Sequence, residues 1–186
     1  KDEPDEVQTF FPGQPGFHKD PAQEQKREAR AVSARIRGIE IWSLYIPNGR
    51  EMTDPHYDYK LQFLYALARY VETRAQSKLL LTGDFNIAPR DEDVWDMSLF
   101  RGKTHVTEPE RAAFQMLEEA GLEEVTRRFT EKERWTYFDY KSLRFQKNEG
   151  MRIDFQLATA PLAELVKGAQ VDLVERAGDK TSDHVP

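Results

Sequence analysis

The residues with the clearest chemical potential lie at the end of an apolar run. Leu79-Leu80-Leu81-Thr82-Gly83-Asp84-Phe85-Asn86 has the length of a buried strand and closes with Gly and short polar side chains. Open α/β sheets bind ligands at the carboxyl ends of their strands, so Asp84 and Asn86 are candidate site residues. Taken alone, Gly83-Asp84 fits a simple turn equally well, because Asp and Asn favour turns through local hydrogen bonds.

Two other stretches carry groups that could act together with such a carboxylate. Asp154 lies in Met151–Ala158, where apolar and polar residues alternate as in a strand. Asp183 and His184 follow small hydroxyl residues, as in a loop that orients an imidazole. His184 alone would be an ordinary loop histidine, whereas an aspartate inside a strand is disfavoured unless it has a partner. Carboxylate, amide and imidazole groups together suit metal-assisted hydrolysis of a phosphodiester.

The order of these motifs resembles a known family. Gly-Asp-Phe-Asn, Arg-Ile-Asp-Phe and Ser-Asp-His occur in sequence, with supporting stretches at Leu44–Gly49, Asp91–Trp95 and Trp135–Lys141. They resemble the endonuclease/exonuclease/phosphatase superfamily, and most fully its exonuclease III-like members, the class II apurinic/apyrimidinic (AP) endonucleases. The similarity runs from about Arg30 to Pro186. It implies an α/β fold, namely a four-layer α/β/β/α sandwich.

The resemblance also implies roles for individual side chains. The implied catalytic set is Tyr45, Asp84, Asn86, Asp154 and His184. Asp84 would orient or deprotonate the attacking water, and Asn86 would hold that water or a phosphate oxygen. His184, with its ring fixed by Asp154, would contact the scissile phosphate, and Tyr45 would donate to it. A metal ion, Mg²⁺ with Mn²⁺ as an alternative, would be held by Asp84, Asn86, Asp183 and His184.

An aromatic and basic stretch bears on the substrate. The residues expected to bind DNA are Tyr137, Phe138, Lys141 and Arg152, since flat rings beside cations suit stacking and phosphate contacts. By the resemblance, Phe138 and Lys141 would enter duplex DNA at a damaged nucleotide. The residues by themselves fit an aromatic core cluster beside a solvated basic loop slightly better.

The leading hypothesis is therefore a Mg²⁺-dependent DNA-repair hydrolase. It would act on duplex DNA as a 3′–5′ exodeoxyribonuclease on 3′ ends and as an endonuclease at abasic sites, which are easily extruded because their stacking is already lost. One alternative is a phosphoesterase of the same superfamily acting on RNA, a phospholipid or an inositol phosphate. Another is a non-catalytic DNA-binding protein.

Composition limits the class of protein without deciding the substrate. The 186 residues suffice for one domain, and 33 acidic against 27 basic residues give a net charge of −6. That charge argues mildly against a polyanion partner, although a nuclease needs only a local basic surface. The chain has no cysteine and no apolar run long enough to span a membrane. We expect a cytoplasmic monomer that does not bind membranes.

Local signals predict the elements that position these residues. A hairpin at Arg37-Gly38 joins two strands, and Asp54-Pro55 begins a helix that leads to the Leu79 strand, so the strands it connects could be parallel. Thr107 and Glu110 form a capping box for a second helix, which ends at Gly121. The remaining expectations are strands at 30–36, 39–46 and 169–174, a short helix from Pro161 to Val166, and an irregular segment over residues 1–25.

The similarity does not cover the whole family pattern. Family members begin with strands that carry an Asn and then a Glu, and neither has a counterpart here; Glu24 is interpreted as a solvated charge. We therefore expect residues 1–186 to be the C-terminal portion of a single domain, without its N-terminal strands and its closing strand. The isolated chain would then have little or no activity.

Overall fold

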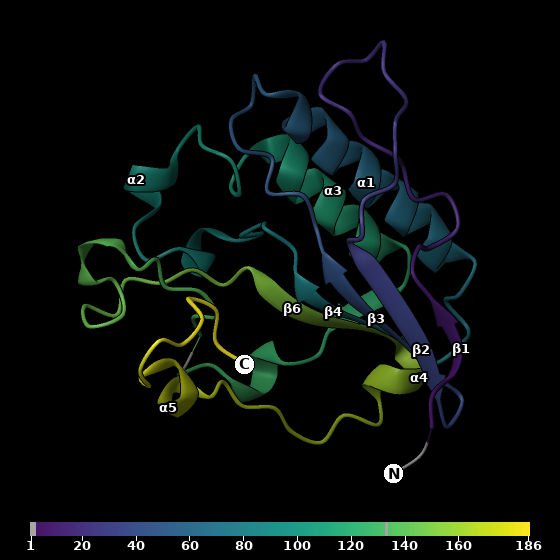
Figure 1. The fold of residues 1–186 in the computed structure, drawn as a ribbon. Coiled ribbons are helices and arrows are strands. Elements are labelled where there is room, and N and C mark those ends of the chain that lie inside the picture. The colour runs from purple at the N-terminus through teal and green to yellow at the C-terminus, as the bar shows by residue number, and fades with distance from the viewer. Residues whose placement is uncertain (1–2, 133) are drawn as a thin grey trace.

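A six-stranded mixed sheet forms the centre of the computed structural model, which describes residues 3–132 and 134–186 (Figure 1). The strands are β1 (Asp5–Gln8), β2 (Ala31–Ile36), β3 (Ile39–Tyr45), β4 (Leu79–Asp84), β5 (Leu122–Glu124) and β6 (Asp154–Thr159). Their order across the sheet is β1-β2-β3-β4-β6-β5. β3 and β4 are parallel, and every other neighbouring pair is antiparallel.

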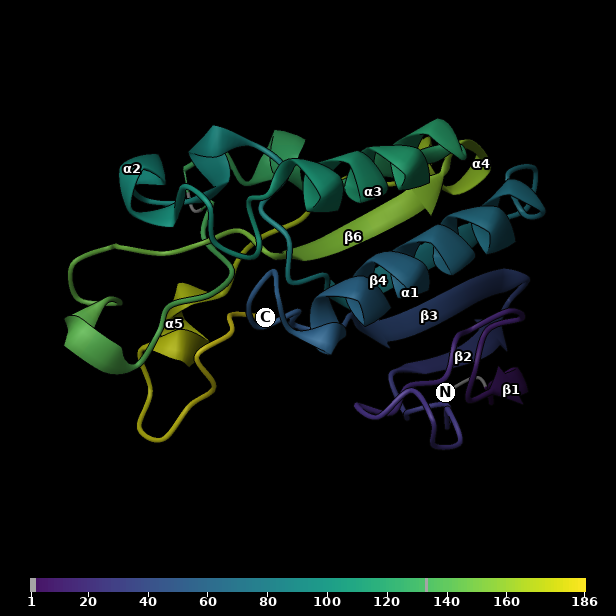
Figure 2. The same cartoon turned by 90° about the horizontal axis from the view of Figure 1, so that it is seen from above.

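Two long helices cover one face of this sheet. The helices are α1 (Pro55–Glu72), α2 (Met97–Phe100), α3 (Glu108–Glu119), α4 (Ala160–Ala163) and α5 (Leu173–Arg176), with short 3₁₀ turns at Asp91–Asp93, Arg127–Phe129 and Lys141–Leu143. Figures 1 and 2 show α1 and α3 side by side over the same face of the strands. None of the helices in the described ranges is long and apolar enough to cross a membrane.

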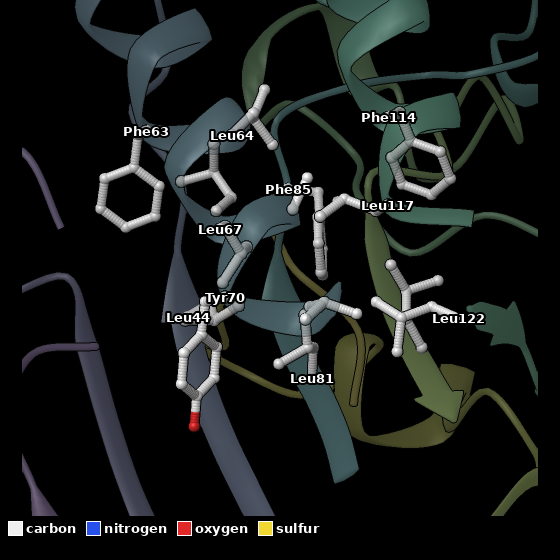
Figure 3. Close-up of a cluster of buried hydrophobic side chains, with 14 of the residues drawn as sticks. Leu44, Phe63, Leu64, Leu67, Tyr70, Leu81, Phe85, Phe114, Leu117 and Leu122 are labelled. Atoms are coloured by element: carbon white, nitrogen blue, oxygen red, sulfur yellow. The ribbon is translucent and has the colours of Figure 1, made fainter. Parts of the chain in front are cut away.

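The main core lies between these two helices and the sheet. Figure 3 shows Leu64 and Leu67 of α1 and Leu117 of α3 directed toward Leu44 and Leu81 of the central strands. All five side chains are buried. Each fully buried Leu stabilises the fold by roughly 1.5–3 kcal/mol relative to an exposed one, so this layer fixes where the central strands end.

The local predictions for the hairpin, the two helix starts and the parallel strand pair are confirmed. β2 and β3 form the predicted hairpin, in which Arg37 and Gly38 both have positive φ values of 51° and 78°. Asp54 caps α1 by accepting a hydrogen bond from the His56 amide at 2.9 Å. The capping box of Thr107 and Glu110 is present at the start of α3. The parallel pairing of β3 and β4 across α1 follows as expected.

Several other predicted elements need correction. The predicted strand at 169–174 is wrong: this segment has no strand partner, and the Asp172 side chain caps α5 through the amides of Val174 and Glu175. β6 begins at Asp154 rather than at Met151, because Met151 makes isolated bridges to Val94 and Tyr137 instead.

Smaller differences affect the chain near its beginning and after β6. The helix expected from Pro161 to Val166 is limited to Ala160–Ala163. The segment expected to be irregular contains the edge strand β1, and its residues 1 and 2 lie outside the described ranges. Glu24 is exposed, as expected for a solvated charge, and forms an ion pair with the exposed Lys26.

The other face of the sheet carries the candidate site residues. Side chains alternate between the faces of a strand, so Tyr45, Asp84 and Asp154 lie opposite the face buried by Leu44, Leu81 and Phe155. Within the described residues there is one sheet with its helix layer, which corresponds to two of the four layers predicted. The site therefore lies on the face of the sheet away from α1 and α3.

Candidate active site

Three neighbouring strands bring a tyrosine and two carboxylates into one row. Tyr45 of β3 is in register with Asp84 of β4, and Asp84 is in register with Asp154 of β6. Directly opposed residues in a sheet have Cβ atoms about 4.5–5.5 Å apart, so these side chains are immediate neighbours. Tyr45 is 52% exposed, so its ring is not enclosed in the core, and the Arg30 guanidinium lies 5.0 Å from its centroid.

Gly83 makes this row possible. Its φ is +136°, and a Cβ at this position would lie 2.0 Å from the backbone oxygen of Leu44. Only glycine tolerates such close contact in this backbone conformation. The Gly before Asp84 is thus required by the approach of β4 to β3.

The end of the chain adds an imidazole to the two carboxylates. His184 Nδ1 lies 2.9 Å from both carboxylate oxygens of Asp154. The segment is held in place by backbone hydrogen bonds from Phe138 to Asp183 (2.8 Å) and from Val185 to Thr136 (2.7 Å). Because Asp154 accepts at Nδ1, the proton of a neutral His184 is fixed on that nitrogen, which leaves Nε2 for a substrate.

Thr136 connects the start of β6 with the segment that carries His184, and it was missed in the sequence analysis. Its hydroxyl oxygen accepts from the amides of Ile153 (3.1 Å) and Asp154 (3.0 Å), while its backbone oxygen accepts from Val185. One residue thus aligns the start of β6 with the segment that carries His184. The only signal in the sequence was its place in the stretch Trp135–Lys141.

Asp84 is bound by the residue two positions further along the chain. Its two carboxylate oxygens accept from the backbone N–H of Asn86 (2.7 Å) and from the Asn86 side-chain amide (2.8 Å). The same amide nitrogen donates to the Ile46 backbone oxygen, and the Asn86 amide oxygen accepts from Asn48 at 2.9 Å. Asn86 is buried, so it lies beneath Asp84 and orients it.

The electrostatics of the site are dominated by crowded negative charge. Burial raises the pKa of Asp84 to about 7, with the neighbouring Asp154 as the second cause, although His184, the Asn86 backbone and Lys60 oppose the shift. Burial lowers the pKa of His184, but its hydrogen bond to Asp154 and the nearby charges, including that of Asp183, outweigh burial and raise it. The crowded carboxylates therefore favour protonation of both Asp84 and His184.

The donor chemistry is compatible with a bound divalent cation. No group of three or more His, Asp or Glu side chains within 3–132 and 134–186 is arranged to hold a metal ion. Mg²⁺, however, is commonly bound by one or two carboxylates and retains several waters, so three such ligands are not required. The raised pKa of Asp84 reflects an ionised form without sufficient counter-charge, which a hard cation would supply.

The residues expected to bind DNA divide into two groups. Lys141 is exposed, and Tyr137 is half-buried with its ring centroid 5.0 Å from that of His184. Phe138 and Arg152 are each only 1% exposed, so neither side chain is available to DNA in this conformation. Arg152 instead binds Glu124 at 3.1 Å, and Phe138 packs edge-on against Phe145.

The family indicated by the motifs and the fold agrees with the comparisons with known proteins. The pattern of the Endonuclease/Exonuclease/phosphatase family matches residues 8–184, and the chain belongs to this family. Exodeoxyribonuclease III of Haemophilus influenzae is 32% identical over 92% of the chain and 68% of its own length. The chain is thus a homologue of exodeoxyribonuclease III.

Solved structures agree with this relationship. An AP endonuclease from Archaeoglobus fulgidus has a TM-score of 0.85 at 31% identity, and a 3′ phosphatase from Neisseria bound to a product DNA hairpin has a TM-score of 0.86 at 33% identity. Each match covers 98% of this chain and 69% of the other. The predicted fold class is confirmed, and the chain spans about two thirds of the length of these relatives.

Proposed function

We propose that this protein is a DNA-repair nuclease that hydrolyses phosphodiester bonds, as a 3′–5′ exodeoxyribonuclease and as an endonuclease at abasic sites. The observation that carries the proposal is the row of Tyr45, Asp84 and Asp154 with His184 joined to it. Its relatives include an exodeoxyribonuclease III, an AP endonuclease and a phosphatase bound to DNA, which supports DNA as the substrate.

Each side chain has a role in the hydrolysis. Asp84 orients the attacking water and accepts its proton. Asn86 fixes the Asp84 carboxylate by its two hydrogen bonds. His184 is oriented by Asp154 and protonated, as its raised pKa favours, so its Nε2–H donates to a non-bridging phosphate oxygen and stabilises the charge that develops there. Tyr45 donates its phenolic hydrogen to the same phosphate.

A divalent cation would complete the charge balance of the site. Asp84 and Asp183 are the residues proposed to hold it, with Mg²⁺ as the first candidate and Mn²⁺ as the second. Of the other two residues expected to bind the metal, Asn86 is buried with its amide group already hydrogen-bonded, and His184 binds Asp154 and the phosphate. When bound, such an ion neutralises the charge of the phosphate and stabilises the leaving oxygen.

Duplex DNA would lie across the exposed part of the 137–150 loop. Tyr140 and Leu143 are 62% and 63% exposed there, beside the exposed cation of Lys141. An exposed ring and an exposed cation suit base stacking and phosphate contact, respectively. The buried Phe138 and Arg152 would support the shape of this loop without touching the DNA.

Incision of a fluorescent duplex with one abasic site tests the proposal. In the full-length protein we expect cleavage with Mg²⁺, no cleavage with EDTA, and a loss of at least about 100-fold in kcat for Asp84→Asn. A parallel panel of a 3′-recessed duplex, a 3′-phosphate, RNA, a phospholipid and an inositol phosphate distinguishes DNA from the other substrate classes. Metal-dependent turnover of only a non-DNA substrate would refute the proposal, as would DNA binding without any turnover.

A further inference from the structure

A fully buried lysine lies beneath the candidate site. Lys60 of α1 is 0% exposed, and its ammonium group donates to the backbone oxygens of Asn48 (3.3 Å) and Asn86 (2.6 Å) and to Glu110 Oε1 (2.5 Å). An ammonium group has three N–H donors, so all three are used. A charged side chain is buried this deeply only when it is fully paired, which makes these three partners informative.

Two of the three partners belong to the loops that carry the catalytic groups. Asn48 follows β3, which ends in Tyr45, and Asn86 follows β4, which ends in Asp84. Lys60 therefore joins both loops to one point on α1.

The conformation of Asn86 makes this connection relevant to catalysis. Its φ is +51°, a left-handed conformation that asparagine adopts more readily than other L residues but that still has to be stabilised by contacts. Lys60 Nζ holds its backbone oxygen, and His105 Nδ1 lies 2.5 Å from the same atom. In this conformation, both the backbone and the side-chain N–H groups of Asn86 reach the carboxylate of Asp84.

Glu110 fixes the position of the lysine in turn. Its carboxylate accepts from the hydroxyls of Thr104 (2.7 Å) and Thr107 (2.6 Å) and from the amide of His105 (3.0 Å). Glu110 is 0% exposed and belongs to α3, so the ammonium group is held between the two long helices. The network extends from α3 through Lys60 to Asn86 and Asp84.

We propose that Lys60 is a positioning residue for the nuclease site: it holds the two catalytic loops in register and keeps Asn86 in the conformation that orients Asp84. This inference rests on the proposed function. The competing explanation is that Lys60 only neutralises Glu110 and stabilises the fold.

A paired substitution separates these two roles. Lys60→Met together with Glu110→Gln removes both charges and leaves no unpaired buried charge. If Lys60 only balances Glu110, this double variant should keep the kcat of the wild type. If Lys60 positions the loops, kcat for abasic-site incision should fall at least about 10-fold while KM changes less than about threefold.

Two further variants control for stability. Tyr70→Phe removes a buried hydrogen bond of the same helix, from Tyr70 to Glu40, and should lower stability without changing kcat. Lys60→Arg keeps the charge opposite Glu110 and therefore the ion pair. A planar guanidinium cannot direct its donors to the same three acceptors, so kcat should again fall. An unchanged kcat in Lys60→Arg and in the double variant would overturn the proposal.

Amide hydrogen exchange provides a readout that does not depend on activity. The Asn86 N–H, bonded to Asp84 Oδ1, should exchange at least about 10-fold faster in both Lys60 variants, relative to the buried Leu79 N–H bonded to Thr159. Equal exchange at Asn86 would contradict the proposal even in an inactive protein. The wild type could also lack nuclease activity while the Lys60 variants show the faster exchange at Asn86. That result would refute the proposed function but would leave the placement of Asn86 by Lys60 intact.

Discussion

Asp84→Asn should stabilise the metal-free protein at neutral and higher pH. Burial, and then the charge of Asp154, raise the pKa of Asp84 from 3.8 to about 7. The folded state thus binds a proton more tightly than the unfolded state between about pH 4 and pH 7, so the wild type loses stability as pH rises through this window. The asparagine side chain carries no charge and does not contribute to this loss.

The magnitude follows from the size of the shift. A pKa raised from 3.8 to about 7 corresponds to about 4 kcal/mol between the protonated and ionised forms, an upper value because Asp84 is partly exposed. Asparagine can accept only one of the two hydrogen bonds from Asn86, which costs about 1 kcal/mol. We expect the variant to be about 1 kcal/mol less stable than the wild type near pH 4 and about 2 kcal/mol more stable near pH 8.

Urea unfolding at pH 4, 6 and 8 in the presence of EDTA measures this difference. The control is Glu123→Gln, whose exposed side chain on β5 should change stability by less than about 0.5 kcal/mol. Repeating the series with Mg²⁺ should stabilise the wild type more than Asp84→Asn. A stability difference between wild type and Asp84→Asn that stays constant from pH 4 to pH 8 would refute the assigned electrostatics of the site.

Other substitutions test separate parts of the account. Gly83→Ala should prevent correct pairing of β3 with β4, because its Cβ would overlap the Leu44 backbone oxygen. We expect insoluble protein or a thermal unfolding midpoint lowered by more than about 5 °C. A midpoint equal to that of the wild type would contradict the observed strand approach. Lys141→Ala should weaken DNA binding at all sequences and lower the salt slope by about 1, measured by fluorescence anisotropy; an unchanged salt slope would remove Lys141 from the proposed interface. Phe138→Ala should cost roughly 3–5 kcal/mol in urea unfolding, because its buried ring packs in the base of the loop; a loss below 1 kcal/mol would show that Phe138 does not anchor it.

The features that could be predicted from the sequence depend on neighbours along the chain. Arg37-Gly38 and Asp54-Pro55 are local signals for a hairpin and a helix start, and both elements form where predicted. Asp84 and Asn86 at the end of the Leu79 strand were recognised as candidate site residues from their immediate neighbours in the sequence as well. The convergence of Asp84 with Asp154 was expected from the resemblance to the family, and their pairing across β4 and β6 supplies the geometry.

The features that could not be predicted depend on partners far away in the sequence. Arg152 looked like a phosphate ligand because its partner Glu124 is 28 residues away, and only the fold brings the two together. The strand expected at 169–174 had a suitable composition but no neighbour to pair with. Lys60 did leave a signal, since it stands in the apolar stripe of α1 with Leu64 and Leu67, where a solvated charge is not expected.

The central claim is that Asp84 and the Asp154–His184 pair act as one catalytic unit on DNA. The most direct measurement is kcat for incision of an abasic duplex by Asp84→Asn, His184→Ala and the double variant under saturating Mg²⁺. When two groups act as one catalytic unit, removing either one removes most of the effect of both. We therefore expect kcat to fall at least about 100-fold in each single variant and to be little lower in the double variant than in the slower single variant. Full multiplication of the two losses, or incision that survives either substitution, would contradict the account.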